Sequence, residues 1–156
     1  HSLSLDMYEQ WITMENTNQW RYTPPTHVIV ALDAAISQFV DAGGVEGRNK
    51  RYSNNRKILV DGMRGMGFET LLPDHLQAPI IVTFKMPSNP SFNFQFFYDQ
   101  LKDEGFIIYP GKLTVSPSFR IGCIGNLGAD EMEGVLAAIK ETIIKMGVAN
   151  GTTRVA

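Results

Sequence analysis

Apolar residues in the first half of the chain recur with the period of an α-helix. Residues 5–19 are moderately helical, and a second helix is predicted from residue 24 to Gly43-Gly44, where two glycines end it. A third helix is predicted over residues 45–66, with Gly67 as its end. The apolar positions behind the second and third helices are Val28, Leu32, Ala35, Ile36, Phe39 and Val40, then Ile58, Leu59, Met63 and Met66.

The second half changes to short apolar segments separated by turn residues, which predicts strands. Two helices are expected with them, over residues 92–104 and 129–146, and residues 150–154 are expected to be a frayed tail. The pattern therefore predicts an α+β unit whose helices cover one face of a small sheet. The expected strands are residues 68–72, 79–85, 106–109 and 118–124.

Composition changes this picture little, but it excludes some partners. The 156 residues carry a net charge of −2, so the sequence predicts neither a nucleic-acid partner nor a charged membrane surface. No apolar run approaches a membrane span, and no signal-peptide pattern is present. The single cysteine, Cys123, fits a reducing compartment, and we predict a cytoplasmic location. The histidines lack metal-ligand spacing, so no metal site is predicted.

One arginine, Arg120, lies inside an apolar strand, between Phe119 and Ile121. Burying a guanidinium there without a partner is costly, so either its head reaches solvent or it binds an anion. Its five donors suit a carboxylate or a phosphate, which it can bind with two parallel hydrogen bonds.

Thr23 is the second candidate, because it precedes two prolines at the start of a helix. It can serve as the N-cap, with Pro24 in the first turn. A helix N-terminus with a free hydroxyl also suits an anion, although simple capping is favoured by the local pattern.

Three further features favour structural interpretations. The turn containing Gly122, Gly125 and Gly128 lacks the spacing of a phosphate-binding loop, so a tight strand-to-helix turn is favoured. The basic run over residues 48–57 is interpreted as a solvated helix face. Cys123 has no activating neighbour and is expected to be a buried, inert thiol.

Several segments together carry a resemblance that covers residues 2 to about 147. They are SLSLDMYEQW at 2–11, WRYTPPTH at 20–27, GGVEGR at 43–48 followed by Arg51-Tyr52, YPGK at 109–112 and FRIG at 119–122. In this order they resemble 2-aminoethylphosphonate–pyruvate aminotransferase, a class V member of the fold-type I pyridoxal-phosphate (PLP) enzymes. The resemblance implies a PLP-dependent transferase.

The resemblance also implies roles for the two candidates and for the domains. Arg120 would be the arginine that binds the carboxylate or phosphonate of the substrates, and Thr23 would help to hold the cofactor phosphate across the interface of a homodimer. Residues 1–44 would be the end of the large domain with its connecting helix. Residues 45–147 would be the C-terminal small domain with its leading long helix, and residues 148–156 a tail.

The chain departs from the family pattern in one respect. The family's Schiff-base lysine, and the aspartate that pairs with the pyridinium nitrogen, belong to a part preceding the SLSLD segment. None of the seven lysines here lies in that lysine motif, and Lys112 belongs to YPGK. The chain therefore resembles a C-terminal fragment, contains no catalytic residue and is expected to be inactive alone.

The reaction implied for the full-length enzyme moves the amino group of 2-aminoethylphosphonate to pyruvate, giving phosphonoacetaldehyde and alanine, a step of phosphonate catabolism. Two alternatives stay open. One is another class V aminotransferase of the alanine–glyoxylate or serine–pyruvate type. The other is a stand-alone α+β module that binds a small anion.

Overall fold

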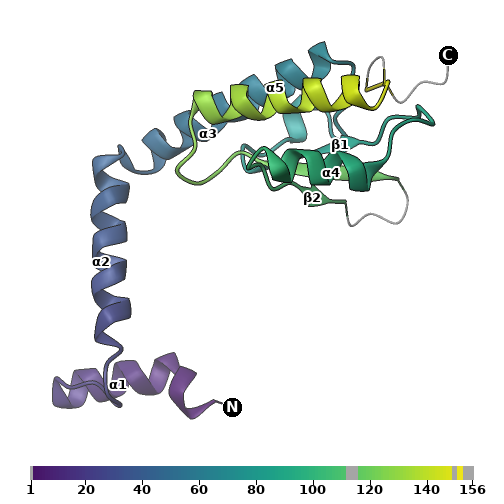
Figure 1. Cartoon of the computed structure of the whole chain (residues 1–156). Coiled ribbons are helices and arrows are strands. Elements are labelled where there is room, and N and C mark those ends of the chain that lie inside the picture. Colours follow the sequence, from purple (N-terminus) through teal and green to yellow (C-terminus); the bar gives the residue numbers. More distant parts are fainter. Residues whose placement is uncertain (1, 112–115, 149–150, 153–156) are drawn as a thin grey trace. The chain divides into compact units, whose positions relative to one another are not determined.

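The computed structural model describes residues 2–111, 116–148 and 151–152. The chain divides into two compact units, His1–Gly44 and Val45–Ala156, and each is described by itself. Figure 1 shows the order of the elements along the chain.

The first unit is helical. A 3₁₀ turn, η1 (Leu3–Leu5), is followed by α1 (Met7–Thr17) and α2 (Thr26–Asp41). The carboxylate of Asp6 caps α1 by accepting a hydrogen bond of 3.0 Å from the backbone N–H of Glu9. No residue of α2 is buried, and its exposed apolar side chains include Val28, Leu32, Ile36 and Val40.

The second unit is a small antiparallel sheet with helices. Its strands are β1 (Ile81–Lys85), β2 (Tyr109–Pro110) and β3 (Ser118–Gly122), in the order β1-β3-β2. Both pairings are antiparallel, with β3 in the centre. The helical elements are α3 (Gly44–Gly65), η2 (Asp74–Leu76), α4 (Phe94–Asp103) and α5 (Ala129–Lys145).

The core lies on one face of this sheet, because alternate strand residues point to opposite sides. Val82, Phe84, Phe119 and Ile121 are buried on that face. Phe119 is central, with its ring centroid 5.7 Å from that of Phe84. Figure 1 shows α5 lying along α3. The two helices touch at Gly62 of α3, where an added β-carbon would overlap the side chain of Leu136 of α5. The helices add Leu59, Met63, Phe97, Leu101, Ile139 and Ile143 to the core.

The strands expected over residues 79–85 and 118–124 are present but shorter, as Ile81–Lys85 and Ser118–Gly122, and the other two depart further from the expectation. The strand predicted over residues 68–72 is wrong, since Thr70 forms only an isolated bridge with Phe84. The chain then turns at Pro73 into η2, which ends the pairing. The strand predicted over residues 106–109 is reduced to Tyr109–Pro110, because the N–H of Phe106 still bonds to the carbonyl of Leu101 in α4. The sheet thus has three strands in the described residues instead of about four.

The expectation of a frayed C-terminal tail is wrong for the part of it that the structure describes. The N–H of Gly151 donates to the carbonyl of Met66 at 2.8 Å. The carbonyl of Thr152 accepts a hydrogen bond of 3.1 Å from Ser88. Gly151 packs directly on the ring of Phe68, where a β-carbon would meet ring atoms at 2.5 Å. Residues 149–150 and 153–156 lie outside the described residues.

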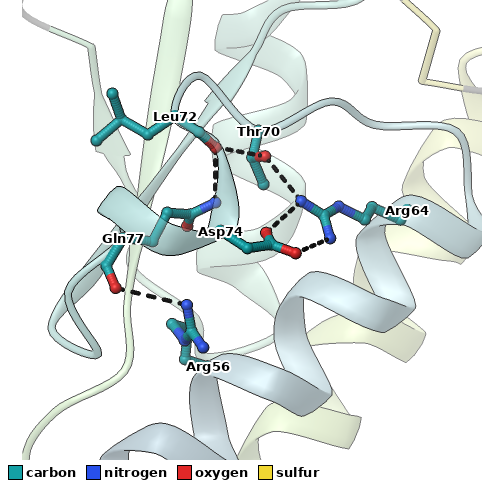
Figure 2. Close-up of polar contacts among 6 residues, drawn as sticks. All are labelled: Arg56, Arg64, Thr70, Leu72, Asp74 and Gln77. Atoms are coloured by element: carbon teal, nitrogen blue, oxygen red, sulfur yellow. Dashed lines mark hydrogen bonds and ion pairs between the residues drawn. The ribbon is translucent and has the colours of Figure 1, made fainter.

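A polar network fixes η2 to α3, as Figure 2 shows. Arg64 binds the carboxylate of Asp74 with both terminal nitrogens, at 3.0 and 2.6 Å, and also donates to Thr70 at 3.1 Å. The side-chain amide of Gln77 donates to the carbonyl of Leu72 at 2.9 Å. Hydrogen bonds from Arg64 hold the pKa of Asp74 below its ordinary value of 3.8.

We expect this ion pair to make stability depend on acid pH. Because the folded-state pKa of Asp74 is lowered, its contribution is present above its ordinary pKa and is lost as pH falls through the lowered value. Asp74→Asn should therefore be less stable than the parent chain near neutral pH, and the difference should vanish in acid. Urea unfolding across pH measures it, with Asp103→Asn on α4 as the control. A difference that stays constant with pH would contradict the assignment.

Among the described residues, no single helix is both long and apolar enough to cross a membrane. The consecutive helices α2 and α3 meet that criterion only when they are counted together.

Candidate functional site

Arg120 lies at the centre of β3, and each neighbouring strand places one residue opposite it. Thr83 of β1 and Tyr109 of β2 are its cross-strand partners. Directly opposed residues share a face of an antiparallel sheet, so these three side chains form one row across the strands. We call them the Thr83–Arg120–Tyr109 row.

The row lies on the face of the sheet that is opposite to the core. Phe119 and Ile121, the neighbours of Arg120 along β3, are buried, whereas Arg120 is half-buried and Tyr109 is 52% exposed. The strand's alternation thus turns the guanidinium away from the apolar core. The guanidinium therefore avoids burial in the apolar core, and its half-buried position leaves it accessible to an anion.

Two contacts orient the guanidinium. Its Nε donates to the carbonyl of Pro110 at 3.3 Å, and its central carbon lies 6.0 Å from the centre of the Tyr109 ring. Toward the described residues the two terminal nitrogens make no hydrogen bond. They are therefore available as the pair of parallel donors that a carboxylate or phosphonate accepts.

The residue after Tyr109-Pro110 is Gly111, and its close contact with Ser118 explains why a glycine is needed there. Its N–H donates to the carbonyl of Ser118 at 2.8 Å, which continues the pairing of β2 with β3. A β-carbon at Gly111 would overlap both the side chain and the backbone of Ser118. The close approach of the two chains beside Arg120 thus requires glycine. Lys112 lies outside the described residues.

The chain that follows β3 is held by side chains of α3. Asn55, which is 1% exposed, donates through Nδ2 to the carbonyls of Cys123 at 3.1 Å and Leu127 at 3.0 Å. Arg51 donates to the carbonyl of Gly125 at 3.0 Å. These bonds fix the glycine-containing turn between the strand of Arg120 and α5.

An amide of the same turn is satisfied by a side chain at the start of α5. The N–H of Gly128 donates to the carboxylate of Glu131 at 2.7 Å, and this bond lowers the pKa of Glu131. Gly125 has a φ of 106°, which favours glycine. The geometry is that of a tight strand-to-helix turn.

The basic run on α3 is only partly a solvated face. Lys50 and Lys57 are exposed, but Arg48 and Arg51 are half-buried around Tyr52. Arg48 donates to the Tyr52 hydroxyl at 3.3 Å, and the Arg51 guanidinium lies 5.3 Å from its ring centre. Hydrogen bonds from Arg48 and Arg51 lower the pKa of the Tyr52 phenol. Arg51 thus joins α3 to the turn, whereas the hydrogen bond of Arg48 to Tyr52 lies within α3.

Thr23 lies in the first unit, whereas Arg120 lies in the second. The prediction that Thr23 caps the helix is wrong, because α2 begins at Thr26 and Pro25 occupies the N-cap position. A residue before proline is pushed toward extended backbone, so two successive prolines delay the helix start. Thr23 is exposed, and its hydroxyl makes no hydrogen bond to the described residues. Its role toward the cofactor phosphate stays a prediction.

Cys123 is fully buried, and burial raises the pKa of its thiol to about 11. This agrees with the expected inert thiol. In the part of the chain that the structure describes, no group of three or more His, Cys, Asp or Glu residues could hold a metal ion.

Comparison with solved structures identifies the fold as that of part of an aminotransferase. An aspartate aminotransferase of subgroup IV from Thermus thermophilus gives a TM-score of 0.74 at 16% identity, over 94% of this chain and 40% of that chain. A ureidoglycine–glyoxylate aminotransferase from Bacillus subtilis gives 0.72 at 18% identity, over 90% of this chain and 36% of that chain. The predicted fold class, a part of a fold-type I aminotransferase with an α+β unit, is confirmed.

The curated relatives that match the chain are 2-aminoethylphosphonate–pyruvate transaminases. The chain is 51% identical to 2-aminoethylphosphonate–pyruvate transaminase 2 of Burkholderia lata, over 95% of its own length and 39% of the relative. It is 55% identical to 2-aminoethylphosphonate–pyruvate transaminase of Rhizobium meliloti, over 97% of its own length and 40% of the relative. The predicted resemblance is confirmed, and the chain spans about two fifths of the length of the curated relatives it matches. No family model matches the chain.

Proposed function

We propose that the chain is the C-terminal part of a PLP-dependent aminotransferase that moves the amino group of 2-aminoethylphosphonate to pyruvate. In this proposal Arg120 binds the anionic group of each substrate, the phosphonate in one half-reaction and the carboxylate in the other. The observation that carries it concerns the Arg120 guanidinium, which lies on the face of the sheet opposite to the core (the open face). Its two terminal nitrogens make no hydrogen bond to the described residues. The names of the curated relatives support this choice of substrates.

The proposal requires PLP, which supplies an electron sink when it is bound. Thr23 is the residue of this chain that would hold its phosphate, from the neighbouring subunit of a homodimer. Its exposed hydroxyl, which makes no hydrogen bond to the described residues, is compatible with that role. No lysine of this chain lies in the family's lysine motif, so the proposal includes that the chain alone is inactive.

The surface of α2 favours this proposal over a stand-alone anion-binding module. A helix that is apolar around much of its circumference is normally buried inside a larger protein. Yet no residue of α2 is buried in this structure. Partners contributed by a further part of the protein, or by a second subunit, would cover it.

A cytoplasmic location is also part of the proposal.

We expect the chain to bind 2-aminoethylphosphonate and pyruvate through Arg120. Calorimetric titration of Arg120→Gln should show at least about a tenfold loss of affinity for both compounds, because a charge-assisted, two-pronged contact is removed. Arg120→Lys keeps the charge and loses the planar fork, so its affinity should lie between those of the parent chain and Arg120→Gln. Ethanolamine, which lacks the phosphonate, is the ligand control. Equal binding by the parent chain and Arg120→Gln would refute the proposed role.

A further inference from the structure

Thr83 stands beside Arg120 with a hydroxyl that the fold does not use. Its carbonyl accepts a hydrogen bond of 2.9 Å from the N–H of Leu71, but its side chain makes none to the described residues. The residue is half-buried on the open face, directly across from Arg120. Opposed side chains in an antiparallel pair have β-carbons roughly 5 Å apart, which is within reach of one shared ligand.

The guanidinium by itself does not match a phosphonate completely. Its Nε is engaged with the carbonyl of Pro110, so two terminal nitrogens remain for a ligand. A carboxylate has two oxygens, which that pair satisfies. A phosphonate has three, and its third oxygen needs a donor from another residue. A threonine hydroxyl is such a donor.

We propose that Thr83 is a specificity-determining residue, which donates its hydroxyl to the third oxygen of a phosphonate held by Arg120. Thr83 thereby favours phosphonates over carboxylates at this one site. The inference rests on the proposed function, since it assumes that Arg120 binds the anion.

Tyr109, at the other end of the row, carries a second hydroxyl and so provides a matched control. Its ring, and not its hydroxyl, is the part that contacts the guanidinium in the structure. Tyr109→Phe keeps that ring and should leave the preference between the two anions unchanged. Thr83→Val keeps the shape and the β-branching that suit a strand, and removes only the hydroxyl.

The test compares the affinities of methylphosphonate and acetate for the 156-residue chain by NMR titration. Thr83→Val should weaken methylphosphonate roughly threefold to tenfold and leave acetate nearly unchanged, since one hydrogen bond is lost. Thr83→Ser, which retains the hydroxyl, should keep the parent's preference. If Thr83→Val weakens both anions equally, or neither, the inference is wrong.

Arg120→Gln separates this inference from the proposed function. If Arg120→Gln weakens both anions and Thr83→Val changes nothing, the proposed function stands and the role of Thr83 is refuted. If Arg120→Gln binds both anions as the parent does, the proposed function fails. A parent chain that binds neither anion at millimolar concentration overturns both.

Discussion

Asn55→Ala should lower the free energy of unfolding by about 3 kcal/mol. The substitution removes the two hydrogen bonds that the side-chain amide donates to backbone carbonyls next to the core. Asn55 is 1% exposed and bonds to the carbonyls of Cys123 and Leu127. Without Nδ2 these carbonyls lose their partner in a place that water enters poorly, and each loss costs about 1–3 kcal/mol. Urea unfolding of the parent chain and the variant measures the difference.

Asn54 provides the matched control for this prediction. It is the adjacent residue of α3 and is exposed. Asn54→Ala should be neutral or slightly stabilising, since alanine has the higher helix propensity. Asn55→Asp, which keeps the shape but offers acceptors to acceptors, should destabilise as Asn55→Ala does. If Asn55→Ala costs no more than Asn54→Ala, the proposed hold of α3 on the turn after β3 is wrong.

Gly111→Ala should destabilise the fold by about 2 kcal/mol and weaken anion binding at Arg120. A β-carbon at this position overlaps Ser118, so the two chains must separate. Their separation displaces the neighbouring carbonyl of Pro110, which accepts the hydrogen bond from Nε of Arg120. A thermal melt and a titration with methylphosphonate measure the two effects.

Gly122→Ala tests whether the effect is specific to this close approach. Gly122 ends β3, and a β-carbon there would meet no atom within 4 Å. We therefore expect a change within about 0.5 kcal/mol for Gly122→Ala. Equal destabilisation by the two substitutions would show that loss of glycine, and not the contact with Ser118, causes the effect.

The helices were predictable because their apolar periodicity is long. The interval predicted for α5, residues 129–146, agrees with Ala129–Lys145 to within one residue. Short strands carry less information, and the segment 68–72 illustrates this. Its apolar residues suggested a strand, but Phe68 enters the core and the chain then turns into η2.

Arg120 could be found from sequence because a charge inside an apolar strand is conspicuous. Thr83 could not, since a threonine in a β-branched strand is ordinary and its pairing with Arg120 depends on long-range register. Asn55 left a signal that was overlooked. It lies four residues before Leu59 and eight before Met63, so it continues the buried stripe of α3.

Thr23 shows how a local rule can fail. The residue type and the following proline favoured an N-cap, but the second proline moves the helix start to Thr26. What remains at Thr23 is an exposed hydroxyl, and its proposed role toward a cofactor phosphate stays a prediction.

The most direct test of an anion site at Arg120 is an NMR titration of the isotopically labelled chain with 2-aminoethylphosphonate. The proposal predicts that the largest saturable shifts occur at the side-chain Nε–H of Arg120 and at the amides of Thr83 and Tyr109. Shifts confined to the arginines and lysines of α3, or no saturable shift at all, would contradict it.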